Sequence, residues 1–203
     1  LTLEALFKSN GANTIQMGVV KDDMDSITKL IETALLTSNI VVTTGGVSVG
    51  DYDFVQDVIK DKLKAEVLFH GVNLKPGMHI LLALKDNKII VALPGFAYSS
   101  TVCAMLYVLP LIYKFRNSNE KLPLVKARIN QDFSRFQAKT IFTACNVEYK
   151  NGEYQINFDG KKSGTSAILT NMLESPALLI QKENSKNIKA GDLVDILLLN
   201  NLK

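Results

Sequence analysis

The residues best suited to chemistry lie in one loop, residues 44–53, which is rich in glycine, serine and aspartate. The apolar β-branched run before it, residues 40–42, predicts a buried strand. The helical spacing of apolar residues after position 53 predicts that a helix begins there. Gly45 and Gly46 let a ligand approach the backbone closely, because neither residue carries a Cβ. Backbone amides in such a loop, beside the start of a helix, favour an anion.

Two carboxylates in the same loop, Asp51 and Asp53, add chemistry that a phosphate site alone does not need. Their oxygens suit a hard metal ion such as Mg²⁺, or a polar heterocycle. Asp53 is also placed to be the N-cap of the following helix, which is a common structural use of aspartate. Both interpretations of Asp53 are open from the sequence.

Strands and helices alternate along the first part of the chain. Apolar patterns predict strands at residues 14–20, 40–44 and 67–69, and a hairpin or two adjacent strands at 79–84 and 88–93. Helices are expected near residues 1–10, 22–35, 53–63 and 97–115, the last one kinked near Pro110. This alternation predicts an α/β fold with a parallel sheet and helices on both faces. Ligands of such sheets bind beyond the carboxyl ends of the strands, so the loops after Thr44, Phe69 and Leu93 are expected to share one edge.

The character of the chain changes after a polar linker near residues 117–119. Short strands are expected at residues 125–129, 140–149, 153–158, 177–181 and 194–199. Asn151–Gly152 is a strong hairpin turn between the second and third of them. We therefore predict an α/β domain over residues 1–118 and a small, mostly β, barrel-like domain over residues 119–203.

The composition limits the classes of function. Apolar residues make up 47% of the 203 residues, enough for a sizeable core, and the net charge of +3 is too weak to favour nucleic acid. Cys103 lies in a strongly apolar segment, which predicts a buried thiol, and neither it nor Cys145 has the spacing of a metal site. A reducing cytoplasm is the simplest expectation.

Four motifs, in a fixed order, resemble those of a known protein family. Together they are more specific than the glycine loop alone. TTGGVSVGDYD, at residues 43–53, resembles the loop of the molybdopterin-binding domain in the MoeA family, the molybdopterin molybdenumtransferases. FHGVNLKPG (residues 69–77), LPG (93–95) and SAILTNM (166–172) follow in the order that this family has. The resemblance covers nearly the whole chain.

The resemblance implies a MogA-like three-layer domain followed by a β domain. It also implies an enzyme that takes adenylylated molybdopterin and molybdate, cleaves the adenylate and inserts molybdenum, with Mg²⁺ as cofactor. The family implies a homodimer and a MogA-like molybdopterin adenylyltransferase as functional partner. Catalytic roles fall on Asp53, Asp22 and Lys75, with Asp53 and Asp22 at the metal. The residues implied in binding the substrate are Thr44, Gly45, Gly46, Ser48, Gly50, Asp51, Pro94, Gly95, Ser99 and Ser166.

Three of these residues also have ordinary structural interpretations. Asp22 suits the dipole or cap of the next helix, Lys75 suits an exposed turn, and Ser166 suits a loop. His70 and His79 lack metal-ligand spacing and are interpreted as structural.

The sequence departs from the family pattern at two places. Met78 stands where the family often has a further lysine after Lys-Pro-Gly, so one expected positive charge is missing. Phe96–Ala97 stands where Leu-Pro-Gly usually continues with Asn-Pro.

Two other functions remain open from the sequence. One is a non-catalytic ligand-binding or scaffold module of the same fold, and the other is a related nucleotide-pyrophosphate hydrolase. Because Leu1 is not methionine and residues 1–10 already resemble a mid-domain helix, we expect the C-terminal two-domain portion of a longer protein. That portion is expected to lack the first strand of its sheet and to be inactive alone.

Overall fold

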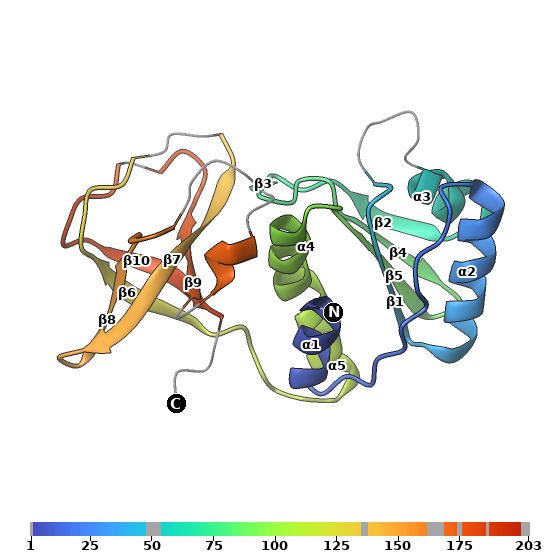
Figure 1. Cartoon of the computed structure of the whole chain (residues 1–203), viewed down its shortest axis with the longest axis horizontal. Helices are drawn as coiled ribbons and strands as arrows, with labels where there is room; N and C mark the ends of the chain where they lie inside the picture. The colour runs from blue at the N-terminus through green and yellow to red at the C-terminus, as the bar shows by residue number, and fades with distance from the viewer. Residues whose placement is uncertain are drawn as a thin grey trace. The chain divides into compact units, whose positions relative to one another are not determined.

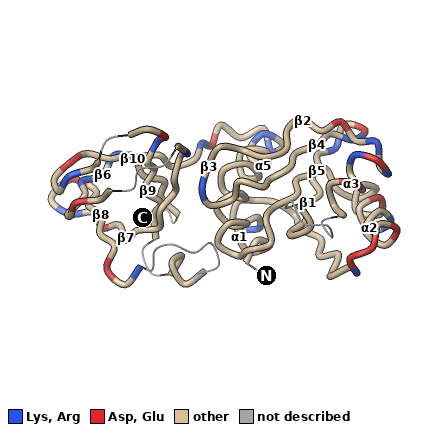
Figure 2. Tube along the Cα trace, turned by 90° about the horizontal axis from the view of Figure 1, so that it is seen from above, with Lys and Arg blue, Asp and Glu red and all other residues tan. Residues whose placement is uncertain are grey.

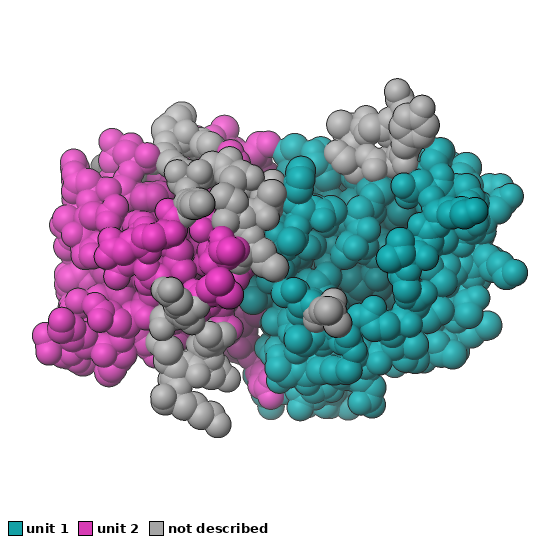
Figure 3. All heavy atoms as spheres, viewed as in Figure 1, with its two compact units in different colours: residues 1–72, 77–119 teal, residues 73–76, 120–203 magenta. Residues whose placement is uncertain are grey.

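The computed structural model describes residues 2–47, 54–134, 138–161, 169–173, 176–185 and 187–199. Internal contacts divide the chain into two compact units, shown in different colours in Figure 3. The first unit consists of residues 1–72 and 77–119, and the second of residues 73–76 and 120–203. Residues 73–76 thus belong to the unit that follows, although their neighbours on both sides belong to the first.

The first unit is built on a four-stranded sheet in the order β1-β5-β4-β2. Its strands are β1 (Ile40–Thr44), β2 (Glu66–His70), β4 (Leu81–Lys85) and β5 (Lys88–Leu93). The strands β1 and β5 pair in parallel, whereas β5–β4 and β4–β2 are antiparallel. The sheet is therefore mixed and not purely parallel as expected, because β4 runs opposite to the other three strands. The reason is the tight turn at Asp86 and Asn87, since a two-residue loop can only join antiparallel strands.

That turn confirms the predicted hairpin. Asp86 and Asn87 both have positive φ, +50° and +61°. Positive φ at both central residues defines a type I′ turn, whose twist matches that of the two strands.

Helices cover both faces of this sheet, as Figure 1 shows for α2 and α3 on one side and α1, α4 and α5 on the other. This confirms the three-layer architecture. The helical segments are α1 (Thr2–Ser9), α2 (Met24–Thr37), α3 (Phe54–Asp57), η1 (Val58–Lys62), α4 (Ala97–Cys103), η2 (Ala104–Val108) and α5 (Leu109–Phe115). The segments η1 and η2 are π-helical.

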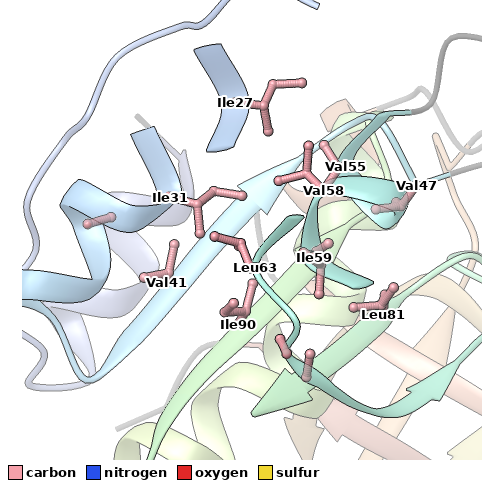
Figure 4. Close-up of a cluster of buried hydrophobic side chains, with 14 residues drawn as sticks. Ile27, Ile31, Val41, Val47, Val55, Val58, Ile59, Leu63, Leu81 and Ile90 are labelled. Carbon is pink, nitrogen blue, oxygen red and sulfur yellow. The ribbon is translucent and has the colours of Figure 1, made fainter. Parts of the chain in front are cut away.

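One hydrophobic core lies between the sheet and α2, α3 and η1. In Figure 4, Ile31 of α2, Val41 of β1, Ile59 of η1 and Ile90 of β5 come together. Ile59 and Ile90 are completely buried, and full burial of such a side chain contributes about 1.5–3 kcal/mol. The core also holds Val47, which is 1% exposed and fixes the start of the glycine loop on the sheet.

The segment Ala97–Phe115 changes from α to π geometry over η2, just before Pro110. Pro110 has no N–H to donate, and its ring crowds the preceding turn, so the regular bonding pattern is interrupted there. The segment has the length and apolar character of a membrane-crossing helix, but 67% of its apolar stretch is buried inside the protein. A core helix has this property.

The strand expected at residues 14–20 is wrong, because residues 12–21 form neither helix nor strand. Met17 and Val20 pack against the core, whereas Ile15 and Val19 are 59% and 103% exposed. A strand also needs a ladder of backbone hydrogen bonds, and within the described residues β1 pairs only with β5. β-Branched composition alone was a poor guide here.

The second unit is a small barrel, as predicted. Its six-stranded sheet has the order β3-β7-β8-β6-β10-β9, and a further pairing of β7 with β9 closes five of the strands into a ring. The strands are β3 (Leu74–Lys75), β6 (Leu124–Ile129), β7 (Thr140–Lys150), β8 (Glu153–Asn157), β9 (Pro176–Gln181) and β10 (Leu193–Leu198). A short 3₁₀ helix, η3 (Leu169–Met172), precedes β9.

Alternate residues of several strands fill the interior of the ring. Residues such as Ile129, Cys145, Ile156 and Ile196 are completely or almost completely buried there. Asn151 and Gly152 have φ values of +52° and +82°, so the β7–β8 turn is also of type I′. In the part of the chain that the structure describes, basic and acidic residues are interspersed in both units, as Figure 2 shows.

Candidate functional site

The turns after β1 and β5 are the centre of the candidate site, and the structure places them side by side. Thr44 and Leu93 are register partners at the ends of the parallel pair. Gly45 N donates a hydrogen bond to Leu93 O at 3.0 Å. Gly95 lies so close that a Cβ built on it would be 3.5 Å from Gly45 Cα. Two motifs that are 50 residues apart in sequence therefore form one surface, which we call the glycine junction (residues 44–46 and 93–95).

The two neighbouring glycines have different reasons to be glycine. Gly45 has φ +86°, and a Cβ built on it meets no other atom of the described residues within 4 Å. Gly46 has φ +70°, and its Cβ would lie 2.5 Å from Val55 Cγ2. Gly46 O also accepts a hydrogen bond from Val55 N at 3.2 Å, which ties the loop to α3. Gly46 thus serves packing, and Gly45 is the residue whose open side suits a ligand.

We expect Gly46→Ala to destabilise the protein by about 2–4 kcal/mol, because overpacking against Val55 adds to the cost of a left-handed backbone. Chemical unfolding measures this difference. In a Val55→Ala background the same substitution should cost less, since the obstructing Cγ2 is gone.

Gly45→Ala is the matched control for this prediction, because it carries the backbone cost without the contact with Val55. Equal unfolding free energies for Gly45→Ala and Gly46→Ala would contradict the packing role of Gly46.

Residues around the glycine junction differ in their access to solvent. Thr44 and Gly95 are exposed, and Pro94 is half-buried. Ser99, expected to contact the ligand, is only 3% exposed within α4. Thr44 and Gly95 are therefore better placed than Ser99 for direct contact with a ligand.

His70 is a neighbour of the loop that the sequence did not associate with it. Its Nε2 lies 3.5 Å from Val47 O, at the upper limit of a hydrogen bond. This weak contact joins the end of β2 to the loop and agrees with the structural interpretation of His70. Only its distance in space reveals the contact, because the two residues are 23 positions apart.

Asp22 lies before α2 with an exposed side chain. The N-cap of α2 is its neighbour Asp23, whose Oδ1 accepts a hydrogen bond from Ser26 N at 2.8 Å. That hydrogen bond lowers the pKa of the Asp23 carboxyl below its usual value. The capping role considered for Asp22 therefore belongs to Asp23, which leaves the Asp22 carboxylate open to solvent.

Lys75 belongs to the second unit. It forms β3 with Leu74, and β3 pairs in parallel with the start of β7. Leu74 is buried and the Lys75 side chain is exposed. The sequence placed Lys75 in a turn of the first domain, whereas the structure divides the expected site residues between two units.

The remaining expected site residues lie outside the described part of the chain; these are Ser48, Gly50, Asp51, Asp53 and Ser166. Among the described residues, no three His, Cys, Asp or Glu side chains gather as metal ligands would. The described residues alone therefore do not form a metal site.

Both cysteines are buried, as predicted for Cys103. Burial raises the pKa of the Cys103 thiol to about 12, so it is protonated at neutral pH. Its Sγ faces Gly77 O at 3.4 Å, and a Cβ at Gly77 would lie 2.1 Å from that sulfur. Cys103 is thus a packing residue beneath the turn that follows Lys75.

Comparisons with known proteins agree with this geometry. Residues 2–114 match the family model described as "Probable molybdopterin binding domain". The chain is 31% identical over 180 residues to the molybdopterin molybdenumtransferase of Staphylococcus aureus (strain Mu50 / ATCC 700699), covering 88% of this chain and 42% of that protein. It is 31% identical over 201 residues to that of Staphylococcus epidermidis (strain ATCC 12228 / FDA PCI 1200), covering 97% of this chain and 46% of the relative. The chain thus spans about half the length of these curated relatives.

Solved structures show the same similarity. The crystal structure of the molybdopterin biosynthesis moeA protein from Pyrococcus horikoshii OT3 is 25% identical with a TM-score of 0.71, covering 97% of this chain and 45% of that one. A second structure of the Pyrococcus protein, 24% identical with a TM-score of 0.76, shares the fold over 99% of this chain and 48% of its own.

Proposed function

This chain belongs to the family of molybdopterin-binding domains, and from that membership we propose that the complete protein inserts molybdate into adenylylated molybdopterin with release of AMP. The relatives named molybdopterin molybdenumtransferase support a role in molybdenum cofactor biosynthesis. The reaction of the whole protein is the proposal, because the chain covers less than half of those relatives.

The glycine junction is the observation that carries this proposal. Gly45 has an open side among the described residues and lies against Gly95, at the carboxyl ends of the parallel pair β1 and β5. Backbone close to solvent at such a place suits a phosphate-bearing heterocycle. We propose that the pterin substrate lies over Gly45 and Gly95, with Thr44 beside it and its phosphate held by backbone amides.

Charged side chains would supply the rest of the chemistry. The Lys75 ammonium would attract the molybdate oxyanion, and the carboxylate of Asp53 would orient the incoming molybdenum species. Water attacks the phosphoanhydride, so that AMP leaves and the phosphate stays on molybdopterin. The two dithiolene sulfurs then bind molybdenum, and one oxide of molybdate leaves as water with the two thiol protons, without a change of oxidation state. Fixed charges that are already in place when the reactants bind lower the barrier most effectively.

We propose that the carboxylate oxygens of Asp22 and Asp53 hold Mg²⁺. When bound, it would neutralise charge on the phosphoanhydride. The exposed carboxylate of Asp22 is chemically suited to it, but no step above depends on where the ion lies.

The experiment is an assay of the complete protein with adenylylated molybdopterin, Mg²⁺ and molybdate. AMP release is measured together with active cofactor, which is detected by reconstitution of an apo-molybdoenzyme. The proposal predicts that both products form and that cofactor formation depends on molybdate. AMP without active cofactor would instead indicate a pyrophosphate hydrolase, and binding without turnover would indicate a scaffold module.

The assembly and location are further parts of the proposal. We expect a homodimer that receives its substrate from a molybdopterin adenylyltransferase in the cytoplasm. Sedimentation of the complete protein tests the dimer, and an excess of monomer at micromolar concentration would contradict it.

The departure at Phe96–Ala97 gives a test of how this site has diverged. Phe96 is the N-cap of α4 without a side-chain hydrogen bond, and it is 61% exposed. Replacing the pair by Asn-Pro supplies a capping side chain and a proline at the first helical position, which should stabilise α4 by about 0.5–2 kcal/mol. If the departure weakens the site, turnover should also rise. A fall in turnover despite higher stability would show that the site has adapted to Phe96.

A further inference from the structure

Lys75, which has a central role in the proposed function, lies in a very short strand. β3 has only two residues, Leu74 and Lys75, which pair with Thr140 and Ile141 at the start of β7. So short a ladder has few backbone hydrogen bonds, and such segments open locally at low cost in free energy. Residues 73–76 are nevertheless part of the second unit, whose colour they share in Figure 3. Contacts other than the ladder must therefore help to hold Lys75.

Asn73, two residues before Lys75, makes two such contacts with its side chain. Its Nδ2 donates hydrogen bonds to Ala138 O at 3.1 Å and to Glu183 Oε2 at 2.7 Å. Its backbone O accepts a hydrogen bond from Thr140 N at 3.2 Å, which extends the ladder with β7. Asn73 thereby joins the segment before β7 to the turn after β9.

The contact with Glu183 is the stronger of the two side-chain hydrogen bonds. It is short, and its acceptor is a carboxylate, which makes a hydrogen bond about twice as strong as a neutral one. The two residues are 110 positions apart, so this bond fixes β3 to a part of the barrel that the ladder with β7 does not reach. The side chain of Leu74, 7% exposed, adds an apolar anchor beside it.

We infer that Asn73 and Glu183 are positioning residues, which hold β3 on the barrel and thereby fix where the Lys75 ammonium meets the oxyanion substrate. This inference rests on the proposed function of Lys75. Neither residue touches the substrate. They limit the positions that the long lysine side chain samples. A charged group binds its ligand more tightly when it is held in the binding position.

The experiment measures the KM for molybdate and kcat of the complete protein in the insertion assay. Glu183→Ala and Asn73→Ala should each raise the KM for molybdate about tenfold, the order expected when a binding group is displaced. Glu183→Gln should restore most of the affinity, because its amide oxygen still accepts from Asn73. Asp132→Ala is the matched control, since it removes an exposed ion pair with Lys189 in the same unit, and it should leave the KM unchanged.

A double-mutant cycle separates positioning from general stability. Glu183→Ala should have no further effect on the KM in a Lys75→Ala background, whereas a merely structural role would act in both backgrounds. A normal KM in Glu183→Ala, with a raised KM in Lys75→Ala, would overturn the inference and leave the proposed function intact. A normal KM in Lys75→Ala would remove the role of Lys75 itself, and with it the inference.

Discussion

Asp53→Asn in the complete protein is expected to abolish molybdenum insertion while the affinity for molybdopterin changes by no more than about threefold, under 1 kcal/mol. Asp53 is the last residue of the loop at residues 44–53, and α3 begins at the next residue, Phe54. Asparagine keeps the size of the side chain and serves equally well as an N-cap, so the start of the helix should be preserved. What the substitution removes is the negative charge that we propose orients the incoming molybdenum.

Asp57→Asn is the matched control, because Asp57 is an exposed carboxylate of the same short helix. Insertion by this variant should be unchanged. The comparison requires equilibrium titration with molybdopterin beside the insertion assay. Parallel loss of binding and insertion in Asp53→Asn, together with lower stability, would assign Asp53 to the fold and not to the chemistry.

Gly45→Val is expected to weaken molybdopterin binding at least about a hundredfold, equivalent to about 2.7 kcal/mol. The described part of the protein leaves room for the new side chain, because no atom of residues 2–47 or 54–134, outside Gly45 and its chain neighbours, lies within 4 Å of a Cβ built on Gly45. The ligand that we propose to lie over Gly45 would collide with the valine side chain. The left-handed backbone adds a stability cost of about 1–2 kcal/mol, which the control must match.

Gly18→Val provides that match. Gly18 lies in the same unit, has φ +85° against +86° for Gly45, and also has nothing within 4 Å of a built Cβ. The two variants should therefore lose similar stability in chemical unfolding, and only Gly45→Val should lose affinity in calorimetric titration. Equal affinities for the two variants would remove Gly45 from the binding surface.

The fold could be predicted where local patterns and turn residues agreed. Asn151–Gly152 and Asp86–Asn87 take the left-handed conformations that type I′ turns need, and the alternating residues of β7 and β9 face the interior of the barrel. The strand prediction for residues 14–20 was wrong because a β-branched segment forms a strand only if another strand pairs with it. Whether a partner strand is available depends on the whole sheet and cannot be predicted from the segment alone.

The candidate site was predictable in composition but not in arrangement. The motifs indicated that Gly45, Pro94 and Gly95 belong together, and the parallel pairing of β1 with β5 places them so. The sequence did not indicate that Gly46 is required by Val55, since that contact depends on how α3 packs. Nor did it indicate that Lys75 joins the barrel, because a two-residue strand leaves no periodic pattern.

Amide hydrogen exchange of the complete protein, with and without bound molybdopterin, tests the central claim most directly. The account places the substrate on the glycine junction, so the ligand should slow exchange in peptides covering residues 44–47 and in those covering residues 95–97. The β7–β8 turn at Asn151 and Gly152 is the internal control and should exchange at the same rate in both states. Slower exchange at both glycine segments together would support a shared binding surface. Saturating ligand that leaves either segment unchanged would contradict it.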